Sequence, residues 1–133
     1  MTLRQDIVLV VDSDLAVREA LKFALEVEGF KVHLCADGLE LFTHPGLRLA
    51  DCLVLEDKMP LMKGVSVLDR LVEQGFPVPI ILMTTHVTDH LRRRAMLAGV
   101  RHLLEKPFLN GALVDSIHDI LGDRTALVSP EAT

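Results

Sequence analysis

The chain has 133 residues, half of them apolar and a quarter charged, which fits one folded domain with its own hydrophobic core. Its net charge of -5 at pH 7 argues against a main role in holding nucleic-acid phosphates, and the lack of Trp and Tyr leaves few platforms for base stacking.

Membrane and secreted classes are disfavoured as well. No apolar run approaches the roughly 18 residues of a membrane helix, and residues 1–6 lack the basic start and apolar stretch of a secretory signal. Two cysteines are too few to staple a small secreted fold. We therefore expect reduced thiols and a cytoplasmic protein.

The first half of the chain alternates short apolar runs with amphipathic segments. Residues 7–11 form a continuous apolar run rich in β-branched residues, typical of a strand covered on both faces. Asp14 is a capping residue type and opens a segment of helical spacing that Gly29 ends. The other elements predicted in this half are a strand at 32–35, a short helix at 38–44 and a strand at 52–55.

The second half continues this alternation. A loop at 56–64 precedes a helix that ends at Gly75, and Asp89 and Asn110 are expected to cap the last two helices. Strands are predicted at 80–83 and 103–104, and the last helix ends at Leu121. Residues 122–133 show no periodicity and are interpreted as a tail or the start of a linker.

Five strand–helix units with nearly all-apolar strands predict an α/β fold, a doubly wound parallel sheet with helices on both faces. In such sheets, ligands bind beyond the carboxyl ends of the strands. No glycine-rich phosphate loop follows the first strand, so nucleotide binding lacks its signature there. The strand ends carry Asp12 and Ser13, then Glu56 and Asp57, then Thr84 and Thr85, and finally Glu105, Lys106 and Pro107.

This set of carboxylates, hydroxyls and one lysine suits a divalent cation and a phosphoryl group. Its order resembles the receiver domain of bacterial two-component response regulators over residues 7–121. The marks are Val10-Val11-Asp12, then Met59-Pro60 with Gly64, then Thr84, and lastly Lys106-Pro107-Phe108, whose proline resembles the family's cis proline.

The resemblance implies a flavodoxin-like sheet of five strands in the order 2-1-3-4-5, with five helices, within a receiver-like domain at 1–121. It also implies a signalling domain and not an enzyme. In the family, a histidine kinase donates a phosphoryl group to one aspartate, beside which Mg²⁺ binds.

Three positions depart from the family pattern. The acceptor position, four residues before Pro60, holds Glu56; Ser13 replaces the second acid of the first strand end. Leu103 occupies the switch position that is usually aromatic. Asp12, the remaining acid of this pocket, Thr84 and Lys106 match, and the last two would contact a phosphoryl group or a carboxylate.

These departures imply a degenerate phosphorylation site. Glu is one methylene longer than Asp, and about 1 Å of misplacement can cost on the order of a hundredfold in rate. A cation would be left with Asp12, Glu56 and the backbone carbonyl of Lys58, which implies weakened Mg²⁺ binding. Glu56 could instead contact Lys106 and Thr84 and mimic the phosphorylated state, so we expect a phosphorylation-independent protein-interaction module.

Two alternatives stay open. Asp57 could be a relocated acceptor, although neighbouring strand residues normally point to opposite faces. A flavodoxin-like binder of small ligands would instead show an enclosed apolar pocket at the strand ends. A zinc site at His86 and His90 has no third ligand nearby, and Cys35 and Cys52 are expected to be unpaired core residues.

The partners implied by the resemblance are proteins, namely a histidine kinase, an effector domain or another regulator. The family commonly uses the face around the fourth helix, fifth strand and fifth helix, which here includes the basic run 92–94. A homodimer through this face is a further option. Neither nucleic acid nor a membrane is expected to bind this domain.

Overall fold

The computed structural model describes residues 5–59 and 62–128. Its strands form one parallel sheet in the order β2-β1-β3-β4-β5, as predicted. The strands are β1 (Ile7–Val11), β2 (Lys31–Cys35), β3 (Cys52–Glu56), β4 (Ile80–Thr84) and β5 (His102–Glu105). The helices are α1 (Leu15–Val27), α2 (Gly38–Thr43), α3 (Gly64–Glu73), α4 (Asp89–Leu97) and α5 (Asn110–Val128), with a 3₁₀ helix η1 (Pro45–Leu49).

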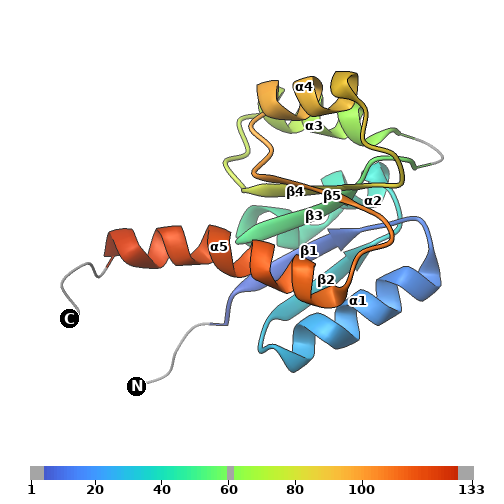
Figure 1. Cartoon of the computed structure of the whole chain (residues 1–133). Helices are drawn as coiled ribbons and strands as arrows, with labels where there is room; N and C mark the ends of the chain where they lie inside the picture. The colour runs from blue at the N-terminus through green and yellow to red at the C-terminus, as the bar shows by residue number, and fades with distance from the viewer. Residues whose placement is uncertain (1–4, 60–61, 129–133) are drawn as a thin grey trace.

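Helices cover both faces of the sheet (Figure 1). Because successive strand residues point to opposite faces, Val8 and Val10 pack with α1 and α5, whereas Leu9 and Val11 pack with α2, η1, α3 and α4. Both cores are built mainly of aliphatic side chains. Within the described part of the chain, no helix is long and apolar enough to cross a membrane.

Local sequence signals explain several element ends. The Asp14 side chain accepts hydrogen bonds from the backbone N–H groups of Ala16 and Val17 and so caps α1, as expected. Gly29 adopts a φ of 97° just after this helix, a conformation that costs glycine nothing. The fold prediction is confirmed at the level of strand order and helix placement.

Some boundaries differ from the prediction. Thr88, and not Asp89, caps α4, because its hydroxyl accepts from the N–H of Leu91. The chain also forms η1 directly after α2, where Leu47 turns into the core. Helix α5 continues past Leu121 to Val128. Pro60 and residues 129–133 of the predicted tail lie outside the described residues.

Parallel strands bring their carboxyl ends to one edge of the sheet, here called the carboxyl edge. Register places Val11 beside Leu55 and Glu56 beside Met83. The residues that follow β1, β3, β4 and β5 therefore meet above the centre of the sheet. The Lys106–Pro107 peptide bond at this edge is cis.

Candidate functional site

Lys106 joins the two acidic strand ends of the carboxyl edge. Its Nζ atom lies 2.8 Å from Asp12 Oδ2 and 3.3 Å from Glu56 Oε1. The Asp12 side chain has no exposed surface, and those of Glu56 and Lys106 are 14% and 19% exposed. Because these carboxylates are little exposed to solvent, they depend on the charge of Lys106 for compensation.

Burial and the two carboxylates act on the pKa of Lys106 in opposite directions. Burial by itself lowers the pKa, since it disfavours the charged ammonium. The hydrogen bond and charge of Asp12, followed by the charge and hydrogen bond of Glu56, outweigh burial and hold the pKa above its ordinary value. Lys106 is accordingly a fixed cation at neutral pH.

Ser13 holds the other oxygen of Glu56. Glu56 Oε2 accepts one hydrogen bond from the backbone N–H of Ser13, at 2.8 Å, and a second from its hydroxyl, at 2.9 Å. Glu56 is thereby bound at both carboxylate oxygens. The sequence did not predict this double contact.

Asp12 is held from its own strand end. Its Oδ1 atom accepts from the N–H of Asp14 at 2.9 Å, and its backbone carbonyl accepts from Arg18 Nη1 at 2.7 Å. The first contact links Asp12 to the start of α1, and the second links it to the next turn. The hydrogen bond from Asp14 holds Oδ1 of the carboxylate, and the other oxygen, Oδ2, faces Lys106.

Thr84 takes a different partner from the one expected. Its Oγ1 atom lies 3.4 Å from Asp57 Oδ2, 3.3 Å from the carbonyl of His86 and 3.2 Å from the His86 nitrogen. In the described part of the chain, its hydrogen bonds therefore go to Asp57 and His86 and not to Glu56. Asp57 directly follows β3, where strand alternation no longer fixes its side chain. The two neighbouring acids thus serve separate partners.

Gly64 lets the loop after β3 close onto the site. Its N–H donates to the carbonyl of Asp57 at 2.6 Å. A Cβ added at Gly64 would lie 2.7 Å from Asp57 Cα and 2.8 Å from the carbonyl oxygen of Glu56. Only glycine permits this backbone approach. The sequence marked Gly64 as part of a motif but gave no reason for it.

Leu103 lies in the middle of β5, beside Leu82 of β4. It is half-buried and packs on the core shared with α4, which includes Leu91 and Ala95. Leu103 is therefore part of the packing on the α4 side of the sheet.

Within residues 5–59 and 62–128, no group of three or more His, Cys, Asp or Glu side chains is arranged to hold a metal ion. His86 and His90 are both exposed. Cys35 and Cys52 are buried and free, and they lie in the cores on opposite faces of the sheet.

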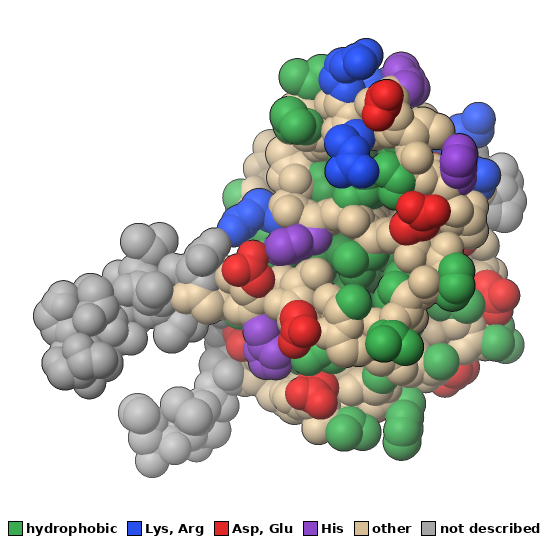
Figure 2. Space-filling view, in the orientation of Figure 1, with side chains coloured by type: hydrophobic (Ala, Val, Ile, Leu, Met, Phe, Trp, Pro, Cys, Tyr) green, Lys and Arg blue, Asp and Glu red, His purple; other side chains and the backbone are tan. Residues whose placement is uncertain are grey.

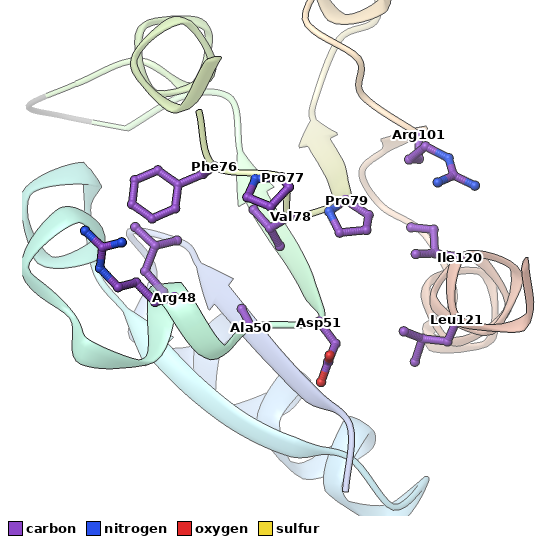
Figure 3. A pocket seen from close by; sticks show the side chains of 11 residues that line it. Arg48, Ala50, Asp51, Phe76, Pro77, Val78, Pro79, Arg101, Ile120 and Leu121 are labelled. Atoms are coloured by element: carbon purple, nitrogen blue, oxygen red, sulfur yellow. The ribbon is translucent and has the colours of Figure 1, made fainter. Parts of the chain in front are cut away.

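Two hollows bear on the idea of a small-ligand binder. One, of about 450 Å³, lies beside Lys106 between α1 and the β5–α5 loop; it is largely open to solvent and mostly apolar. The other, of about 400 Å³, lies at the opposite edge of the sheet, between η1, the loop before β4 and the middle of α5, where Arg48 and Arg101 flank it (Figure 3). Neither has the enclosed form that this alternative predicted at the strand ends.

The chain matches a known protein family over most of its length. The model of the response regulator receiver domain family matches residues 8–118. The chain belongs to this family. Receiver domains are signalling modules of two-component systems, and family members typically bind Mg²⁺ at the acceptor site.

Several regulators are similar to this receiver domain. The transcriptional regulatory protein FixJ of Bradyrhizobium diazoefficiens is 35% identical over 94% of this chain and 61% of its own length. The response regulator MprA of Mycobacterium ulcerans is 35% identical over 94% of this chain and 53% of its own length. The chain thus spans little more than half the length of these two relatives.

Solved receiver structures share the fold. The signal receiver domain of a LuxO repressor protein from Vibrio parahaemolyticus superposes with a TM-score of 0.86 at 22% identity, over 98% of this chain and all of its own. The response regulator StyR superposes with a TM-score of 0.81 at 32% identity, over 96% of this chain and 67% of its own. These likenesses agree with the strand order described above.

Proposed function

We propose that this receiver domain works as a phosphorylation-independent protein-interaction module. The observation that carries the proposal is the position of Glu56, which replaces the acceptor aspartate and is held by Ser13 and Lys106 at once. A negative group is thereby supplied to Lys106 without a phosphoryl donor. A cytoplasmic location is part of the same proposal.

The chemistry of Glu56 supports this proposal. Transfer to a carboxylate needs one oxygen in line with the donor phosphorus, with cations neutralising the charge that develops. Here Oε2 already accepts two hydrogen bonds and Oε1 is ion-paired. Freeing an oxygen for attack would first break contacts that stabilise the folded state.

Asp57 carries the rival function, because its Oδ2 atom lies 3.4 Å from Thr84 Oγ1. As an acceptor, an Asp57 oxygen would bond to the donor's phosphorus while the bond from phosphorus to the donor breaks, releasing the nitrogen of a phosphohistidine or the oxygen of an acyl phosphate. Lys106, the cation that such a reaction needs, is paired with Asp12 and Glu56 instead. This pairing favours the interaction module.

The partner surface in this proposal is the face of α4, β5 and α5. Figure 2 shows basic side chains gathered toward the α4 end, where Arg92 and Arg93 are exposed. Met96 adds apolar surface at 71% exposure. A protein with acidic groups around apolar contacts fits this face; an effector domain, another regulator or a second copy of the chain could supply it.

Intact-mass measurement after incubation with a small acyl phosphate and Mg²⁺ tests the proposal. We expect no gain in mass for the wild type, while a receiver with an unbroken motif gains one phosphoryl group in parallel. The matched variant is Glu56→Asp combined with Ser13→Asp, which restores the two acidic positions of the family pattern and should restore uptake.

Uptake by the wild type would contradict the proposal. Its loss in Asp57→Asn would then identify Asp57 as the acceptor, and its loss in Glu56→Gln would identify Glu56. Readout at neutral pH preserves an acyl phosphate during the measurement.

A further inference from the structure

Ser13 occupies the place in the site where the resemblance expects a second acid. Instead of a charge, it offers two donors, and both point to Glu56 Oε2 at 2.8 and 2.9 Å. The longer side chain of Glu56 spans from β3 to this strand end. Hydroxyl and carboxylate are complementary here, whereas two carboxylates at this distance would repel one another.

Every carboxylate oxygen of the pair Asp12 and Glu56 already has a donor. Asp12 Oδ1 accepts from the N–H of Asp14, and Asp12 Oδ2 accepts from Lys106. Glu56 Oε1 faces Lys106, and Glu56 Oε2 faces Ser13. The ammonium of Lys106 thus lies between the two carboxylates, in the role that a bound cation would have.

These donors compete directly with a divalent cation. Mg²⁺ demands nearly ideal octahedral oxygen geometry and gives up its water reluctantly. To bind here it would have to displace Ser13 from one acid and share the other with Lys106. Two carboxylates whose oxygens already have donors are therefore poor ligands for Mg²⁺.

We infer that the site has replaced its divalent cation with protein groups, with Ser13 as the residue that makes the exchange possible and Lys106 as the resident cation. The receiver domain is therefore metal-independent. The inference rests on the proposed function only in placing Glu56 at the acceptor position.

Access does not explain the loss of metal binding. Ser13 is exposed, and the side chain of Glu56 keeps 14% of its surface. A hydrated ion can reach this edge of the sheet. The hydrogen bonds from Ser13 to Glu56 prevent Mg²⁺ binding, so substitution of Ser13 alone should restore it.

Thermal unfolding in MgCl₂, compared with EDTA at matched ionic strength, tests the inference. The midpoint of the wild type should not move. Ser13→Asp should unfold at a lower temperature in EDTA, because it loses a donor and faces Glu56 with a like charge. Mg²⁺ at tenfold its dissociation constant should then raise the midpoint of Ser13→Asp by roughly 4 °C.

Ser13→Asn is the matched control, since it has nearly the shape of Asp without the charge. Its midpoint should be the same with and without Mg²⁺. A rise in the wild type, or no rise in Ser13→Asp, would overturn the inference.

A second measurement covers the case in which Ser13→Asp does not fold. Mn²⁺ added to the wild type should leave the amide resonances of Ser13 and Lys106 sharp, and selective broadening of these resonances would overturn the inference. Phosphoryl uptake by the wild type would instead contradict the proposed function, so the two failures are distinguishable.

Discussion

Lys106 Nζ lies 2.8 Å from Asp12 Oδ2, and the carboxylate it meets has no exposed surface. Removing one member of such a pair leaves a buried charge without compensation. The pair also ties the end of β1 to the end of β5, two strands separated by β3 and β4 in the sheet. This contact thus adds a side-chain link across the carboxyl edge.

Lys106→Met should accordingly destabilise the fold by about 3 kcal/mol. Urea unfolding at neutral pH measures this difference. Lys58→Met is the control, because Lys58 is exposed in the loop after β3. Equal stabilities for the two variants would show that the ion pair contributes nothing.

The same comparison has a defined pH dependence. The pKa of Lys106 is raised in the folded state, so its contribution is complete below the ordinary lysine pKa and is lost as pH rises through the folded pKa. The difference in unfolding free energy between the wild type and Lys106→Met should therefore be constant around neutral pH and should disappear in strong alkali.

The buried thiols predict a decline in stability between pH 9 and 12. Burial is the main cause that raises the pKa of Cys35 and of Cys52 from 9.0 to about 12. Unfolded thiols lose their protons in this window while folded thiols keep them, so stability is full below pH 9 and falls above it. Chemical denaturation at stepped pH should show a shallower decline for Cys52→Ala, and an unchanged slope would contradict this explanation.

Gly64→Ala should destabilise the protein by about 2 kcal/mol, as expected when an added methyl meets backbone that cannot yield. The new Cβ would lie 2.7 Å from Asp57 Cα. Gly111→Ala is the control, since nothing lies within 4 Å of its Cβ position and alanine favours a helix. Guanidinium unfolding measures the free energy of unfolding of both variants. If Gly64→Ala is as stable as the wild type, the close approach at Gly64 is refuted.

The sequence predicted the individual helices and strands well because its strongest signals are local, whereas the strand order was implied by the resemblance to receiver domains. The apolar run that forms β1 and the capping Asp14 each report the structure of their own neighbourhood. Helix η1 escaped prediction because Pro45 and Gly46 indicate a break, whereas Leu47 gains core burial by turning inward.

The site was predictable in its members but less so in its contacts. Strand order brings Asp12, Glu56 and Lys106 together, and the pairing of Glu56 with Lys106 was expected. The hydrogen bonds of Ser13 to Glu56 and of Thr84 to Asp57 depend on side-chain directions at strand ends, which no periodicity encodes.

The central claim, that Glu56 keeps the domain in one signalling state, is tested most directly by amide chemical shifts. Spectra of the wild type should superimpose before and after addition of an acyl phosphate with Mg²⁺. The variant that combines Ser13→Asp with Glu56→Asp should instead shift at Thr84, Leu103 and Lys106. Shifts of the wild type at these three residues would contradict the claim.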